Sequence, residues 1–172
     1  MLISTDNGKS WIKQKDTNAK YVKYIACNGN KWIAFNNALP IMIFSNDDGN
    51  TWIMKPFNKA QWRPIPACNG NTWVAVCAGN TILLSTDNGN TWITKNSGAG
   101  KSLNSIACNG NTWVSVGDNG TILLSTDNGN TWITRNSGTD KSLNSIACNG
   151  NTWIAVGSNG TILRSQDTAV WK

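Results

Sequence analysis

Histidine and glutamate are both absent from this chain of 172 residues, and their absence restricts the chemistry that it can perform. A chain without His cannot build a Ser-His-Asp or Cys-His catalytic site, nor a zinc site that contains His. An acid/base pair of carboxylates would have to consist of two Asp side chains. We therefore expect a protein that is not an enzyme and that has no catalytic residue, no metal site and no cofactor.

Long apolar runs and a basic leader sequence are missing as well. The chain begins Met-Leu-Ile-Ser-Thr-Asp-Asn-Gly, and a run of about 18 apolar residues, the length that crosses a membrane, occurs nowhere. These features predict no signal peptide, no membrane span, and a cytoplasmic or virion-associated location. The formal net charge of +6 predicts a solvated basic edge and does not favour a nucleic-acid partner.

Proline is scarce, with 4 residues against 16 Gly, and Asn is abundant. This composition is typical of short strands joined by tight turns. The predicted fold class is all-β, in a single domain that spans residues 1–172.

One motif organises the chain. The sequence Ser-x-Asp-x-Gly-x-(Thr/Ser)-Trp, here called the box, occurs four times and has a decayed fifth copy that starts at Ser165. The copies begin 40 or 41 residues apart, and a fixed period of about 40 residues marks propellers, solenoids or arrays. The defining positions of the four intact boxes are Ser4, Asp6, Gly8 and Trp11; Ser45, Asp47, Gly49 and Trp52; Ser85, Asp87, Gly89 and Trp92; and Ser125, Asp127, Gly129 and Trp132.

Residues 65–104 illustrate one repeat. Apolar segments predict strands at 65–68, 73–76, 81–85 and 92–95, joined by an Asn-Gly-Asn turn, a small-residue connection and the box. The third strand is apolar on both faces, so its sheet needs cover on both sides. Sheets that pack around a common axis provide that cover, and we predict a β-propeller of about four four-stranded blades.

The ends of the chain carry incomplete repeats. Complete repeats cover residues 25–64, 65–104 and 105–144, and the fragments 145–172 and 1–24 remain. We predict that N- and C-terminal strands close one blade together. Because both fragments contain the third strand, other arrangements stay open: a tail, a five-bladed form, or a homo-oligomer through a shared terminal blade.

The box resembles the Asp box, or BNR repeat, of sialidase-like and photosystem-assembly-factor-like propellers. The resemblance implies that the box is the hairpin between the third and fourth strands, with a structural role. Calcium binding is the alternative for Asp-x-Asn-Gly, but no bidentate Glu follows. Sialidase catalysis would need three substrate-binding arginines and a Tyr–Glu pair. The chain has only Arg63, Arg135 and Arg164, two Tyr and no Glu. The Tyr–Glu pair therefore cannot form, and no catalytic residue is carried over from the sialidases.

Four cysteines recur at one position of the repeat, in the sequence Ala-Cys-Asn-Gly-Asn. Equivalent positions on neighbouring blades are not expected to meet within the 7 Å or so that a disulfide requires. We therefore predict small buried thiols at Cys27, Cys68, Cys108 and Cys148.

The repeat breaks its own pattern near the start of two blades. Ser102 and Ser142 correspond to Tyr21 and Trp62, Ser105 corresponds to Tyr24, and Leu103 corresponds to Arg63. Aromatic and basic side chains suit the stacking of a sugar or the binding of an acidic partner, although a locally repacked rim explains them equally well. The candidate ligand- or partner-binding residues are Tyr21, Lys23, Tyr24, Trp62 and Arg63.

These observations favour a non-enzymatic binding or structural module, as a component of a phage or bacterial surface assembly, with a protein or a glycan as its partner. The first alternative is a lectin-like carbohydrate-binding propeller. The second is a vestigial glycosidase that uses Asp alone, for which Asp118 and Asp140 are the candidates outside the boxes.

Overall fold

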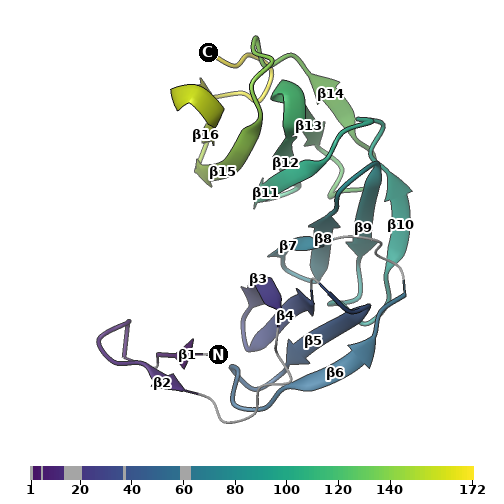
Figure 1. Cartoon of the computed structure of the whole chain (residues 1–172), viewed down its shortest axis with the longest axis vertical. Helices are drawn as coiled ribbons and strands as arrows, with labels where there is room; N and C mark the ends of the chain where they lie inside the picture. The colour runs from purple at the N-terminus through teal and green to yellow at the C-terminus, as the bar shows by residue number, and fades with distance from the viewer. Residues whose placement is uncertain (1, 5, 14–20, 37, 59–62) are drawn as a thin grey trace.

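The computed structural model describes residues 2–4, 6–13, 21–36, 38–58 and 63–172. Its strands form antiparallel sheets that follow one another around an arc, and the described residues contain no α-helix (Figure 1). The predicted all-β class is confirmed.

Three sheets have the four strands predicted for one blade, paired in chain order, and are called blades 1 to 3. Blade 1 consists of β3 (Val22–Asn28), β4 (Lys31–Asn36), β5 (Ile41–Ser45) and β6 (Ile53–Pro56); blade 2 of β7 (Ile65–Asn69), β8 (Thr72–Val76), β9 (Thr81–Ser85) and β10 (Ile93–Asn96); and blade 3 of β11 (Leu103–Asn109), β12 (Thr112–Gly117), β13 (Ile122–Ser125) and β14 (Ile133–Arg135). The strands of blade 2 begin and end within one residue of the predicted positions.

The remaining strands form two smaller sheets. Blade 4 contains β15 (Leu143–Asn149), β16 (Thr152–Gly157) and β17 (Ile162–Ser165), while β1 (Leu2–Ile3) and β2 (Ile12–Lys13) form a hairpin around the first box. The 3-10 turns η1 (Asp118–Gly120) and η2 (Ser158–Gly160) join the second and third strands of blades 3 and 4.

The apolar core lies between neighbouring blades. In blade 2, Trp73 and Leu83 pack toward blade 1, whereas Val76 and Ile82 pack toward blade 3. This division follows from the pleat, because successive side chains of a strand point to opposite faces of the sheet. Each blade therefore has a tryptophan face toward the preceding blade and an aliphatic face toward the following one.

The predicted closure of one blade by N- and C-terminal strands is wrong. β1 pairs with β2, whereas β15, β16 and β17 form a separate sheet at the opposite end of the arc (Figure 1). C-terminal residues themselves take the place of the fourth strand in blade 4: the N–H of Arg164 donates to the carbonyl of Lys172 at 2.7 Å, and the N–H of Lys172 donates back at 3.1 Å. The corresponding pair in blade 3 is Leu124 and Ile133.

Candidate functional site

Each box is a turn that is held by its own side chains. In blade 3, Asp127 accepts the N–H and the hydroxyl of Thr131 at 2.9 and 2.6 Å, and Ser125 Oγ accepts the N–H of Gly129 at 2.9 Å. Asn128 and Gly129 have φ values of 61° and 84°, which Asn and Gly tolerate better than other residues. The hydrogen bonds, chiefly from the Thr131 hydroxyl, lower the pKa of Asp127 to about 2.

The other three intact boxes are built in the same way, and hydrogen bonds lower the pKa of Asp6, Asp47 and Asp87 to about 2 as well. The box also binds the neighbouring Asn-Gly-Asn turn, because the N–H of Asn128 donates to the carbonyl of Asn111 at 3.0 Å. The box and this turn therefore lie on the same face of the arc. The carboxylates of Asp6, Asp47, Asp87 and Asp127 are therefore occupied by hydrogen bonds within their own turns.

A ladder of hydrogen bonds joins the first strands of the four blades, which line the inner side of the arc (Figure 1). Asn69 Nδ2 donates to the carbonyl of Gly110 on the next blade at 2.7 Å. In the other direction, the thiol of Cys108 donates to the carbonyl of Cys68 at 3.2 Å. The Cys and Asn of the Ala-Cys-Asn-Gly-Asn segment thus connect blades.

The prediction of buried thiols at Cys27, Cys68, Cys108 and Cys148 is wrong for Cys27 and holds in part for the other three, whereas Cys77, which lies outside that prediction, is buried. All five cysteines are free, as expected, but Cys27 is exposed and the other three ladder cysteines are partly buried, since they lie at the inner rim. Burial raises the pKa of Cys68 to about 12 and that of Cys108 to about 11. These thiols are therefore protonated at neutral pH.

On the face opposite the boxes, a short segment leads into the first strand of each blade and is here called the entrance of that blade. The entrances of blades 3 and 4, which contain Ser102 and Ser142, are alike. The carbonyl of Ser102 accepts the N–H of Asp118 at 3.0 Å, and that of Ser142 accepts the N–H of Ser158 at 2.8 Å. A Cβ at Gly117 would collide with the carbonyl oxygen of Ser102. The serine entrances are therefore tightly packed parts of the framework.

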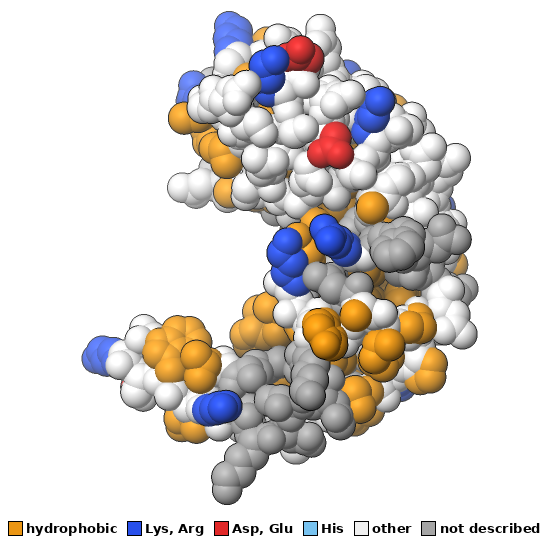
Figure 2. Space-filling view, in the orientation of Figure 1, with side chains coloured by type: hydrophobic (Ala, Val, Ile, Leu, Met, Phe, Trp, Pro, Cys, Tyr) orange, Lys and Arg blue, Asp and Glu red, His pale blue; other side chains and the backbone are white. Residues whose placement is uncertain are grey.

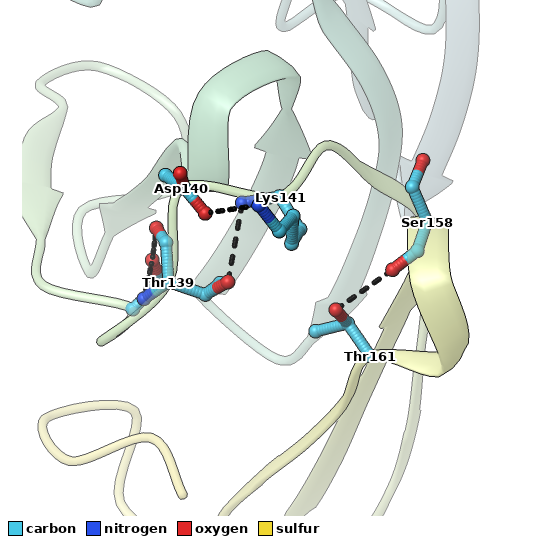
Figure 3. Close-up of polar contacts among 6 residues, drawn as sticks. Thr139, Asp140, Lys141, Ser158 and Thr161 are labelled. Atoms are coloured by element: carbon cyan, nitrogen blue, oxygen red, sulfur yellow. Dashed lines mark hydrogen bonds and ion pairs between the residues drawn. The ribbon is translucent and has the colours of Figure 1, made fainter.

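Short polar contacts also hold the segment that leads into blade 4. Figure 3 shows the ion pair of Lys141 with Asp140 at 2.9 Å, with the N–H of Lys141 donating to the Thr139 hydroxyl at 3.1 Å. Nearby, the Thr161 hydroxyl donates to the carbonyl of Ser158 at 2.8 Å.

The entrances of blades 1 and 2 differ from this framework. Tyr21 is 66% exposed and has a φ of 71°, and the exposed Arg63 has a φ of 50°. A non-glycine residue in this left-handed region costs about 1–3 kcal/mol, and such strain gathers at binding sites. The ammonium of Lys23 lies 5.2 Å from the centre of the Tyr24 ring, within cation–π range.

The structure brings together part of the predicted site. Lys23 and Tyr24 contact each other, and the first strands β3 and β7 are neighbours along the inner rim, so the two entrances adjoin. No hydrogen bond or ion pair connects Arg63 to Tyr21, Lys23 or Tyr24 within the described ranges. Trp62 lies outside the described residues. Figure 2 shows hydrophobic side chains gathered over the N-terminal arm of the arc, whereas the other arm is mostly polar.

Sequence reasoning missed a second basic cluster, on the box face. The ammonium groups of Lys31 and Lys55 lie 5.8 and 4.9 Å from the centre of the Phe44 ring, and Lys31 Nζ also binds Asn90 Oδ1 at 3.4 Å. Burial, and then the charge of Lys55, lower the pKa of Lys31. The signal was available, because Lys31 stands where the other repeats have Thr.

The two Asp side chains considered for a glycosidase, Asp118 and Asp140, each have another partner. Asp118 accepts a hydrogen bond from Asn104 Nδ2 at 2.8 Å, and Asp140 pairs with Lys141. In the part of the chain that the structure describes, no group of three or more His, Cys, Asp or Glu side chains is placed to hold a metal ion. The same residues include no helix long and apolar enough to cross a membrane.

Solved structures resemble the arc closely in shape. YCF48 bound to D1 peptide has a TM-score of 0.74 at 16% identity, with 99% of this chain and 59% of that chain covered. YCF48 from Cyanidioschyzon merolae has a TM-score of 0.72 at 14% identity, with coverages of 99% and 63%. The fold is that of a β-propeller.

A third propeller extends the comparison to enzymes. The GH74 enzyme of Niastella koreensis has a TM-score of 0.69 at 19% identity, and the match covers 99% of this chain but 28% of that one. The chain spans less than two thirds of the length of each of these three proteins. No family model and no curated protein matches the chain. The likeness is therefore one of fold.

Proposed function

We propose that the chain is a non-enzymatic binding module of the Asp-box propeller type, which holds an acidic protein segment at the entrances of blades 1 and 2. The observation that carries the proposal is the pattern break at these entrances. Tyr21 is exposed where blades 3 and 4 have Ser102 and Ser142, whose backbone carbonyls bind the framework. Lys23 and Arg63, which also lie in the entrances of blades 1 and 2, are exposed as well.

The chemistry of the entrances suits an acidic peptide. Exposed Lys and Arg attract carboxylates, and Tyr side chains contribute contact area at low cost in conformational entropy. The backbone at Tyr21 and Arg63 is strained in both places, which supports a role beyond packing. The YCF48 propeller bound to D1 peptide lends further support to a peptide partner.

The test is binding of fluorescein-labelled acidic peptides from an array, measured by fluorescence anisotropy against peptides in which Asn and Gln replace Asp and Glu. The double variant Tyr21→Ser with Arg63→Leu restores the residues found in blades 3 and 4. We expect it to weaken binding by about tenfold or more, as loss of an interface hot spot does. The matched control is Lys101→Ala, which removes an exposed charge at the entrance of blade 3 and is expected to change affinity less than about twofold. Equal binding of the acidic and amide peptides would contradict the proposal.

The lectin alternative rests on the exposure of Tyr21, since an exposed aromatic ring can stack on a sugar. Reproducible signals on a glycan array that are lost in Tyr21→Ala and Trp62→Ala, with no binding of acidic peptides, would favour it. The glycosidase alternative and the membership of a phage or bacterial surface assembly stay predictions.

A further inference from the structure

The two ends of the arc expose faces that are buried everywhere else in the chain. On the aliphatic face of blade 4, Val156 is 39% exposed and Ile162 is 68% exposed. Their counterparts in blades 2 and 3 are fully buried against the following blade; these are Val76 and Ile82, and Val116 and Ile122. Blade 4 therefore presents a blade-binding surface without a blade on it.

The opposite end presents the other half of the same interface. Ile25 of blade 1 is 44% exposed, whereas the equivalent Ile106 and Ile146 are buried against the preceding blade. Trp32 is only partly buried, whereas Trp73 and Trp113 are fully buried. The exposed aliphatic face of blade 4 and the exposed tryptophan face of blade 1 are thus the two sides of a contact that the chain makes three times within itself.

The hydrogen-bond ladder along the inner rim is open at both ends in a complementary way. In the ladder, the Asn of one blade donates to the Gly carbonyl of the next, as Asn109 does to Gly150 at 2.8 Å. Asn149 of blade 4 and the Gly29 carbonyl of blade 1 are the free donor and acceptor of this series within the described residues. In the cysteine series, the thiol of Cys148 donates to the carbonyl of Cys108 at 3.1 Å. In the part of the chain that the structure describes, the thiol of Cys27 and the carbonyl of Cys148 are the free ends of this series.

Charged residues replace the repeat residues at these two ends. Arg164 on the aliphatic face of blade 4 stands where blades 2 and 3 have Leu84 and Leu124. In the box of blade 1, Asp48 stands where blades 2 and 3 have Asn88 and Asn128. Both charged side chains are exposed.

The internal contacts show where these charges would lie if the interface were repeated once more. A Cβ at Gly129 would lie 3.4 Å from Leu84 Cδ1, so the Leu84 position contacts the box of the following blade. Beside that glycine, Asn128 Nδ2 reaches Thr72 Oγ1 of the preceding blade at 2.7 Å. Arg164 would therefore meet the box that contains Gly49 and Asp48. Opposite charges at the two ends favour this pairing.

The Asp48 side chain is also not used within its own blade. In blades 2 and 3 the corresponding Asn accepts the indole N–H of the second-strand tryptophan, as Asn88 does from Trp73 at 2.9 Å. The indole nitrogen of Trp32 is buried and has no hydrogen-bond partner among the described residues, so Asp48 does not fill this role.

We propose that two copies of the chain associate head to tail, with blade 4 of each copy packed on blade 1 of the other, to form a closed ring with eight blades. The arc in Figure 1 is open on one side, and a second arc would close it through two identical contacts. Each contact extends the internal blade interface, with Ile162 buried against Ile25 and Trp32, and Arg164 paired with Asp48.

The first test is the mass of the full chain in solution, measured by light scattering and by sedimentation at micromolar concentration. We expect twice the chain mass of 18.6 kDa. Ile162→Glu places a charge in the contact and is expected to give the monomer. The matched control is Ile93→Glu on β10, where Ile93 is 50% exposed outside the contact, and it should leave the dimer intact.

The second test is a charge exchange. Arg164→Asp alone and Asp48→Arg alone each place like charges at both contacts, and each should weaken the dimer at least about tenfold. An equimolar mixture of the two single variants restores opposite charges at both contacts, and we expect it to form a heterodimer with wild-type affinity.

Several results would overturn the proposal. One is a wild-type monomer, whether the N-terminal hairpin of the same chain covers the exposed face or nothing does. Another is a mass that rises with concentration without reaching a limit, because the ring would then not close. The same holds for a dimer that Ile162→Glu leaves intact, for charge variants that associate like the wild type, and for a mixture of them that stays monomeric.

Discussion

The box of blade 2 and the box of the N-terminal hairpin have nearly the same sequence but different surroundings. The local turn is the same in both, because Gly89 N–H donates to Ser85 Oγ at 2.9 Å and Gly8 N–H donates to Ser4 Oγ at 2.8 Å. Trp92, however, is buried, whereas Trp11 is 61% exposed. The comparison shows that the box forms from its own side chains, while its tryptophan contributes to the core only where a neighbouring blade covers it.

The largest expected difference between interior and terminal repeats concerns tryptophan. Trp73 is fully buried between blades 1 and 2, and Trp73→Ala should lower the free energy of unfolding by about 3–5 kcal/mol. Trp11→Ala should lower it by less than about 1 kcal/mol, because the Trp11 side chain is mostly in solvent. Urea unfolding measured by far-UV circular dichroism gives both values. A similar loss for both variants would show that the hairpin packs against a blade in solution.

Alanine substitutions at two equivalent glycines can distinguish the cost of a strained backbone from the cost of a clash with a neighbouring segment. Gly120 and Gly160 both have a left-handed backbone, with φ values of 68° and 72°. A Cβ at Gly120 would collide with the carbonyl oxygen of Thr139, whereas one at Gly160 meets nothing. Gly160→Ala should cost about 1 kcal/mol of unfolding free energy from strain alone, and Gly120→Ala about 1–3 kcal/mol more. Thermal unfolding of the two variants in parallel checks this, and equal midpoints would contradict it.

The asparagine ladder offers a smaller contrast. Asn109 donates to the carbonyl of Gly150, whereas Asn149 has no such partner in the described part of the chain. Asn109→Ala should therefore lower the unfolding free energy by about 0.5–1.5 kcal/mol, and Asn149→Ala should leave it nearly unchanged. Denaturation at low protein concentration is the appropriate measurement, since the Asn149 variant should affect only the association of copies. A large loss for Asn149→Ala in the monomer would point to an unrecognised partner.

The smallest effect is the pH dependence of the box carboxylates. The pKa of Asp87 is 3.8 without its partners and about 2 in the folded chain, where Thr91 chiefly lowers it. A group with a lowered pKa contributes its stability above pH 3.8 and loses it as the pH falls toward 2. Asp87→Asn should flatten the acid unfolding curve of the blades in this window, only slightly because the carboxylate is exposed to solvent. Asp6→Asn should leave the curve of the blades unchanged, and ellipticity recorded between pH 5 and 2 would reveal a departure from either expectation.

Much of the fold could be predicted because the same turn and strand signals recur in each repeat. Asn-Gly turns, alternating apolar residues and the box fix strands to within one residue in blade 2. The turns of the box depend on local contacts, because Asp127 and Ser125 bind backbone groups close in sequence. The candidate site was also visible in sequence, as positions where the pattern changes.

The details of that site depended on the folded chain. Sequence comparison cannot give the left-handed backbone of Tyr21 and Arg63, or the stacking of Lys23 on Tyr24. The sequence does not reveal the cluster of Lys31, Phe44 and Lys55, because these residues come from three different strands of blade 1, β4, β5 and β6. Side-chain contacts of this kind depend on how strands pair, and pairing joins residues far apart in the chain.

The sequence by itself determined the blade, because the turns and hydrogen bonds of a blade are local. Its two apolar faces also require cover by neighbouring blades. The tertiary structure alone decided what happens at the ends. The stacking of four blades carries β1 and β17 to opposite ends of an arc, where their fragments do not meet (Figure 1). The physical reason is that each blade interface rotates one blade by a small angle relative to the next. The sum of these rotations, which no single repeat encodes, decides whether the two ends of a chain meet or stay open to a second molecule.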